Sequence, residues 1–352
     1  MAFDPNRFGG TKGNTGRNRI DYAREVGDAL YQAMNAVRPR ISQFYGVPGF
    51  PPNELRSDNR LVQKRTQKIE EDEWNNSSAF IPDEWAQFAE PVVAYYLNDE
   101  KLFANANNYA FPASHFDDLF RGTDVVFGIQ EKDGEKDGVF SIDASTGTGR
   151  DSVDKKFRVS IDEHRGVSDV KYCLHDEKKW SEEEAPHFVV GMSPASIQKA
   201  LLTFHLENGV LKGHDEDLDT KFIIVSELHR QVCMQLKLLG KKPEDSTSPL
   251  AQRIQKLTEL KKPLSLSLKK MFGFPVNGKL SPDVLRKMND EYLRMVKKMG
   301  AFDSVYNNIM QESLDRLSNN RGDLIGIKTE RDRKIGSIAN KAVKKDKKIV
   351  SK

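Results

Sequence analysis

Apolar residues recur at helical spacing near the N-terminus and again through the last third of the chain. Between Ile20 and Val37 they fall every three or four residues, which predicts an amphipathic helix. The charged, asparagine-rich segment 59–78 indicates a linker with some helix, and Pro82 is predicted to open a second helix. Beyond Pro194 the pattern is helical, and the predicted helices are 194–208, 219–240, 248–262, 282–299 and 302–318.

Short β-branched runs between these helical regions predict a sheet. The runs are 123–130, 138–145, 167–174 and 187–192. A turn rich in glycine, aspartate and lysine joins the first two as a hairpin, and a helix at 151–164 is predicted to connect the second and third. We therefore expect an α+β (mixed α/β) fold. It has a small mixed β-sheet of about four strands flanked by helices, an N-terminal helix and an all-α C-terminal region.

The same pattern divides the chain into five regions. They are a disordered N-terminus (1–18), an N-terminal helix and linker (19–80), an α/β core (81–210), a helical domain (211–320) and a basic, disordered tail (321–352). The tail holds 11 Lys/Arg and four Asp/Glu, which gives it a net charge of +7. Because the whole chain has a net charge of +3, the first 320 residues have a net charge of −4. Such a tail is typical of a phosphate-binding segment or of a solubilising end. The amphipathic C-terminal helices could form a homo-oligomer, clamp DNA or serve as a docking surface.

Composition excludes several classes of protein. Cys173 and Cys233 are the only cysteines, which excludes a disulfide framework and a cysteine-based zinc site. No apolar run is long enough to span a bilayer and no secretory signal is recognisable, so we expect a cytoplasmic protein with no membrane partner. The triplet Asp215, Asp217 and Asp219 lacks the glycine and glutamate of a calcium loop, and is predicted to cap a helix.

Two aspartates stand at the ends of neighbouring predicted strands. Asp124 precedes the run V-V-F-G-I, and Asp143 follows V-F-S-I. Carboxylates in this arrangement could hold a divalent cation between them. An aspartate at a strand end is also common as a turn or cap residue. Nearby, S-H-F-D-D predicts a helix with Ser114 as its N-cap and Asp117 and Asp118 in its first turn.

The order helix, strand, strand, helix, strand around these acids resembles the core of the PD-(D/E)XK nuclease-like superfamily, over about residues 82–174. In that family one acid lies on a central strand, and a second begins a D/E-x-K motif on the next strand. Asp124 matches the first acid and Asp143 the second, while Ser145 stands at the lysine position. Some members carry the lysine on the following helix, where Lys155 and Lys156 are found here.

The resemblance implies hydrolysis of phosphodiester bonds in nucleic acid, DNA rather than RNA. Asp124 and Asp143 would bind Mg²⁺ or Mn²⁺, with Glu90 as a further metal ligand. Lys155 or Lys156 would orient the attacking water or neutralise developing charge. Without a lysine in the motif, the same core could instead serve as a non-catalytic nucleic-acid-binding or assembly protein.

A second resemblance overlaps the same residues. D-A-S-T-G-T-G, which starts at Asp143 and includes Gly147, follows a strand and precedes a predicted helix. It looks like the glycine-rich first motif of S-adenosylmethionine-dependent methyltransferases, which implies that Asp176 or Glu177 would bind the ribose of that cofactor. The helical pattern beyond Ser193 does not supply the further strands that this fold requires.

Overall fold

The computed structural model describes residues 16–76, 85–99, 102–103, 107–130, 137–146, 166–240 and 247–271. All of them belong to one compact unit within residues 1–307. The predicted helices 151–164, 282–299 and 302–318 and the basic tail lie outside the described residues. These features, the boundaries of the five regions and the homo-oligomer stay predictions.

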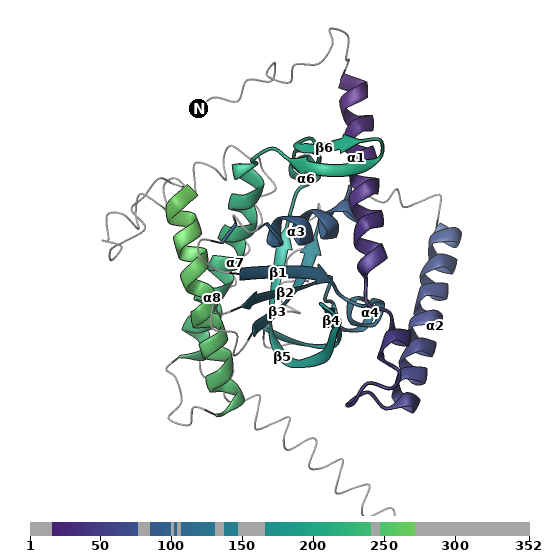
Figure 1. The fold of residues 1–352 in the computed structure, drawn as a ribbon, viewed down its shortest axis with the longest axis vertical. Coiled ribbons are helices and arrows are strands. Elements are labelled where there is room, and N and C mark those ends of the chain that lie inside the picture. The colour runs from purple at the N-terminus through teal and green to yellow at the C-terminus, as the bar shows by residue number, and fades with distance from the viewer. Residues whose placement is uncertain are drawn as a thin grey trace, which may run out of the picture. The chain divides into compact units, whose positions relative to one another are not determined.

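Helices and strands alternate irregularly along the chain (Figure 1). The helices are α1 (Gly16–Val37), η1 (Ile41–Phe44), α2 (Pro52–Asn76), η2 (Ala86–Phe88), α3 (Ala89–Leu97), α4 (His115–Arg121), α6 (Pro194–Leu201), α7 (Leu218–Leu239) and α8 (Pro249–Met271). The strands are β1 (Asn107–Pro112), β2 (Val125–Gln130), β3 (Asp137–Ser145), β4 (Val167–His175), β5 (Lys178–Gly191), β6 (Phe204–Glu207) and β7 (Val210–His214). No helix among the described residues is long and apolar enough to cross a membrane.

Five of the strands form one mixed sheet in the order β1-β2-β3-β5-β4. Neighbouring strands are antiparallel except β3 and β5, which are parallel. The remaining two strands, β6 and β7, form a separate hairpin. The predicted α+β fold is confirmed, with one more strand in the sheet than expected.

Alternation of side chains along the central strands divides the core between the two faces of the sheet. Val125 and Phe127 of β2 pack with α1, α3, α6, α7 and α8 in the main core, whereas Val126 between them belongs to a second cluster. The second cluster draws on β1, β4 and β5, because the β4–β5 hairpin curves over that face (Figure 1). Gly128 allows the ring of Tyr109 to lie directly on the sheet, where a β-carbon would overlap it.

Helix α7 covers the part of β5 that extends beyond its pairing with β4. The side-chain amide of Gln231 donates to the carbonyl of Val189 at 2.6 Å and accepts from its N–H at 2.9 Å. One turn later, Gln235 donates to the carbonyl of His187 at 2.9 Å. These amides satisfy strand groups in the buried interior, and so attach α7 to β5.

Several elements differ from the sequence prediction. Residues 59–76 of the segment 59–78, which was expected to be a linker with some helix, belong to the 25-residue helix α2. The helix predicted from Pro82 begins as η2 and α3, and Pro91 lies in the first turn of α3, where a proline fits without a kink. The helix predicted at 194–208 ends at Leu201, and the hairpin β6–β7 follows. Helix α8 continues through Pro263 because that residue and its apolar neighbours are buried, which outweighs the lost backbone hydrogen bond.

Candidate functional site

The two aspartates singled out by the sequence lie beside each other at one end of the sheet. The backbone N–H of Asp124 donates to the carbonyl of Ile142 at 2.9 Å, and its Oδ2 accepts from the N–H of Ala144 at 2.7 Å. Asp124 is therefore bonded to both neighbours of Asp143 in the chain. Both aspartates are half-buried. The register of β2 and β3, in which Val125 faces Ile142, places them on adjacent positions of the two strands.

Asp143 points away from the main core. Its neighbours Ile142 and Ala144 pack against that core, and successive side chains of a strand point to opposite faces. The carboxylate of Asp124 reaches across to the same stretch of β3.

A buried helix cap holds the segment that leads into Asp124. The Ser114 hydroxyl oxygen accepts from the N–H of Asp117 at 3.1 Å, which confirms the predicted N-cap of α4. The carboxylate of Asp117 in turn accepts from the backbone N–H groups of Lys171 at 2.7 Å and Tyr172 at 3.1 Å. Burial raises the pKa of Asp117, although these hydrogen bonds oppose the shift. The cap was predictable from S-H-F-D-D, but its attachment to β4 was not.

Glu90, the predicted third metal ligand, is bound to an arginine. Its Oε1 lies 2.5 Å from Nη2 of Arg38, and burial raises its pKa to about 7 although Arg38 opposes the shift. Arg38 also donates to the carbonyl of Ala113 at 2.9 Å and lies 3.7 Å from Asp118. Over the part of the chain that the structure describes, no three His, Cys, Asp or Glu side chains gather as a metal-binding group. Glu90 is thus not brought together with both aspartates in such a group.

The lysine position of the resemblance is occupied by a buried residue. Ser145 ends β3 with 3 % of its surface exposed, and its carbonyl accepts from the N–H of Met192 at 2.9 Å. The alternative lysines, Lys155 and Lys156, lie outside the described residues. So does Gly147 of the glycine-rich motif.

The two candidate ribose ligands of the methyltransferase reading lie in a tight turn. Asp176 and Glu177 connect β4 to β5, and both have left-handed backbones, with φ of 47° and 64°. Such a pair is typical of a two-residue hairpin turn. The described sheet also contains a single parallel pair of strands, whereas the methyltransferase fold would require several. The geometry therefore gives no support to that alternative.

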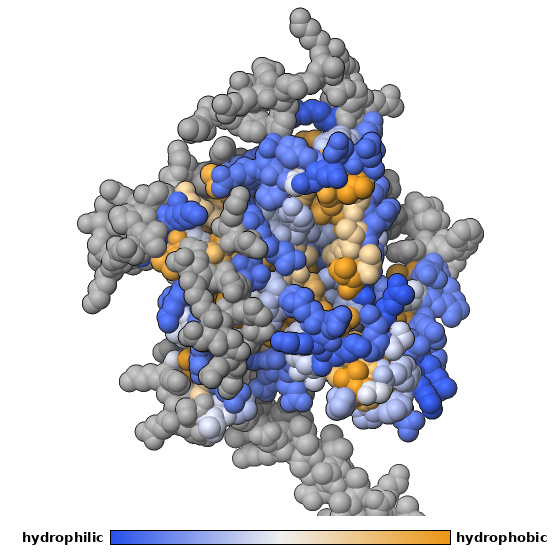
Figure 2. Space-filling view, viewed as in Figure 1, coloured by the Kyte–Doolittle hydropathy of each residue, from blue (hydrophilic) through white to orange (hydrophobic). Residues whose placement is uncertain are grey.

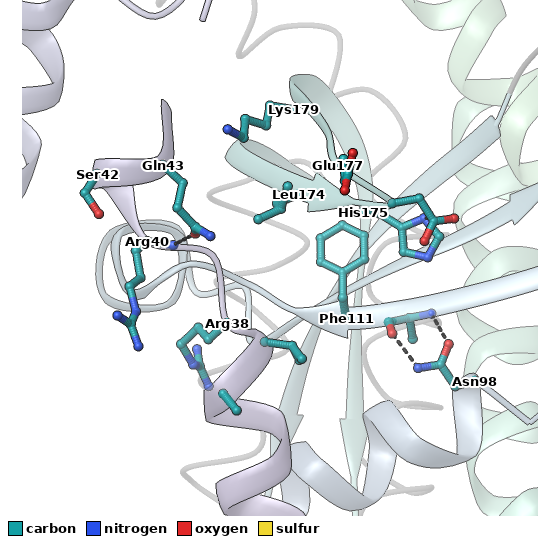
Figure 3. A pocket seen from close by; sticks show the side chains of 14 residues that line it. Arg38, Arg40, Ser42, Gln43, Asn98, Phe111, Leu174, His175, Glu177 and Lys179 are labelled. Carbon is teal, nitrogen blue, oxygen red and sulfur yellow. Dashed lines mark hydrogen bonds and ion pairs between the residues drawn. The ribbon is translucent and has the colours of Figure 1, made fainter. Parts of the chain in front are cut away.

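A wide groove of about 1090 Å³ opens between the end of α1, η1, β1 and the β4–β5 turn. Residues of η1 lie on one side and those of the turn on the other (Figure 3). The ring of His175 stacks 5.7 Å from that of Phe111, and the side-chain amide of Asn98 donates to the carbonyl of Ala110 and accepts from its N–H.

The charges that line the groove are mixed, since its lining includes Arg38, Arg40 and Lys179 together with Asp176 and Glu177.

Comparison of the chain with models of protein families, with curated proteins and with solved structures found no match.

Proposed function

We propose that the chain is a metal-dependent nuclease-like protein that acts on phosphodiester bonds of nucleic acid, with DNA as the favoured substrate. The observation that supports this most strongly is the position of Asp124 beside Asp143. Asp124 forms hydrogen bonds with Ile142 and Ala144, the two chain neighbours of Asp143. Two half-buried carboxylates on neighbouring strands are the donor set that the resemblance to the nuclease-like superfamily requires.

The donors fit Mg²⁺ or Mn²⁺. Magnesium is usually held by one or two carboxylates together with waters and substrate phosphates, so two aspartates are enough without a third acid. When bound, the ion would stabilise negative charge on the scissile phosphate and lower the pKa of a bound water. Asp124 and Asp143 would hold the ion, and α4 and β3 would keep their carboxylates in place. Lys155 or Lys156 would neutralise charge beside them.

A cleavage assay tests this proposal. Purified protein is incubated with labelled single-stranded, duplex and branched DNA and with RNA, in Mg²⁺, in Mn²⁺ and in EDTA. We expect metal-dependent cleavage that is lost in Asp124→Asn and in Asp143→Asn. Asparagine at 124 keeps an oxygen that can accept from the Ala144 N–H, so the charge is removed while the local fold is preserved. Asp28→Asn, at an exposed position on α1, removes the same charge and should cleave as the wild type does.

One observation favours a second function, a non-catalytic nucleic-acid-binding or assembly protein on the same core. Ser145 is buried at the position of the motif lysine, so the strand itself supplies no ammonium group to the site. A protein of this kind would bind DNA with unchanged affinity after Asp124→Asn and would leave every substrate intact in both metals. Cleavage by the wild type that disappears in the aspartate variants would exclude it.

A further inference from the structure

Helix α2 carries a row of basic side chains along one side. Four of them, spaced four residues apart, define what we name the basic stripe: Arg56, Arg60, Lys64 and Lys68. All four are exposed. Residues four apart in a helix lie on the same side, about 6 Å from one another along the axis. The basic stripe therefore extends over about 18 Å of helix.

The opposite side of α2 attaches the helix to the protein. Leu55 is 1 % exposed in an aromatic cluster, and Val62 packs against the same cluster. The buried carboxylate of Asp58 binds Nζ of Lys171 at 2.5 Å and the hydroxyl of Tyr172 at 2.7 Å. At 100° per residue these attachment points are centred roughly opposite the basic stripe. The stripe thus points away from the protein, and the surface over α2 is predominantly hydrophilic (Figure 2).

The side chains of the stripe form no ion pair with a described acid, although Glu71 follows Lys68 by three residues on the same helix. Within the described part of the chain, none of its four side chains takes part in an ion pair or hydrogen bond. The two acids at the start of α2, Glu54 and Asp58, both bind Lys171 instead. Like charges four residues apart destabilise a helix. Repulsion along the stripe therefore slightly opposes folding of α2, and an anionic partner that lies along the stripe would relieve it.

We propose that the basic stripe binds the sugar-phosphate backbone of nucleic acid, and this rests on the proposed function for the nature of the partner. One strand of duplex DNA carries a phosphate about every 3.4 Å along the axis, so the stripe spans about five phosphates. Such contacts fix the position of the nucleic acid without reading its sequence. A membrane surface fits less well, because membrane-binding helices expose a broad apolar face, and the apolar face of α2 is buried.

The test measures the affinity and the salt dependence of DNA binding. Fluorescein-labelled duplex and single-stranded oligonucleotides are titrated with wild type and with R60Q/K64Q/K68Q in EDTA, at 50 to 300 mM KCl, by fluorescence anisotropy. Each phosphate contact contributes about 0.9 to the slope of log K against log [salt] for duplex DNA. The triple variant should therefore lose about 2 to 3 from the slope, and on the order of tenfold or more in affinity at physiological salt.

The control is R19Q/K262Q/K270Q, which removes the same charge from exposed positions outside α2. It should keep the wild-type slope, and both variants should keep the wild-type far-UV circular dichroism. An equal loss in both variants, an unchanged slope in the α2 variant, or wild type that binds anionic vesicles but no nucleic acid would overturn the proposal.

The same proteins separate this inference from the nuclease activity. If the wild type binds DNA through the stripe but never cleaves it in Mg²⁺ or Mn²⁺, the result would support the basic stripe as a DNA-binding surface and contradict the nuclease activity. If the wild type cleaves DNA in a metal-dependent way and R60Q/K64Q/K68Q binds DNA normally, the result would support the nuclease activity and contradict DNA binding by the stripe.

Discussion

Replacing Asp117 with alanine should destabilise the protein by several kcal/mol, because this carboxylate joins two elements that are distant in the chain. Asp117 is 0 % exposed. It accepts from the backbone N–H groups of Lys171 and Tyr172, and from the Ser114 hydroxyl at 2.6 Å. These bonds attach α4 to β4, and α4 leads within three residues to Asp124.

The size of the effect follows from the donors that alanine leaves behind. The N–H groups of Lys171 and Tyr172 lose their carboxylate acceptor, and each buried unsatisfied donor costs about 1–3 kcal/mol. Burial reduces the stability that is lost in the alanine variant, because burial raises the pKa of Asp117 and so disfavours its charged form in the folded wild type. We therefore take the lower part of the range. The free energy of unfolding should fall by about 3 kcal/mol, which is about 100-fold in the folding equilibrium.

Urea denaturation at pH 7, followed by far-UV circular dichroism, measures this loss. The control is Asp118→Ala, one residue further along the same helix. The Asp118 side chain is 34 % exposed and lies 3.7 Å from Arg38, so its removal should cost less than about 1 kcal/mol. Equal losses in the two variants would refute the assignment of Asp117 as the group that attaches α4 to β4.

Two further predictions concern Glu90 and Gly128. Burial raises the pKa of Glu90 from 4.5 to about 7 against the opposing effect of Arg38, so the folded protein loses stability as the pH rises through this window. Urea denaturation at pH 4.5, 6 and 8 should compare the free energies of unfolding of wild type and Glu90→Gln. Between pH 4.5 and pH 8 the wild type should lose on the order of 3 kcal/mol relative to the variant. A difference between the two proteins that does not change with pH would contradict the raised pKa. Gly128→Ala should lower the free energy of unfolding by about 1–3 kcal/mol, because its β-carbon would overlap the ring of Tyr109. Thermal unfolding should show a smaller effect for Gly138→Ala, whose β-carbon would meet a ring edge at 3.3 Å.

Much of the local structure follows from the amino-acid sequence alone. The β-branched runs at 123–130, 138–145 and 167–174 correspond closely to β2, β3 and β4. Ser114 caps α4 as predicted, and Asp217 accepts from the N–H groups of residues 219 and 220 at the start of α7. These features depend on side-chain propensity and on bonds between residues a few positions apart, which are visible in a short window of sequence.

Other elements were missed because their own composition is misleading. β1, N-N-Y-A-F-P, contains two asparagines and ends in proline, both rare in strands, and it forms because it pairs with β2. The first half of β5, K-K-W-S-E-E-E, is mostly polar and is held by pairing with β4. α2 has few apolar residues, and a buried aspartate anchors it to β4.

The candidate site shows the same division. The hairpin between the first two predicted runs is enough to bring Asp124 near Asp143, because the side-chain period and the short turn set the register. Only the tertiary structure decided that Glu90 would meet Arg38, 52 residues earlier in the chain, and that the basic stripe would form no ion pair with a described acid. Such partners depend on how whole elements pack, and the free energy of that packing comes from buried surface shared between distant segments.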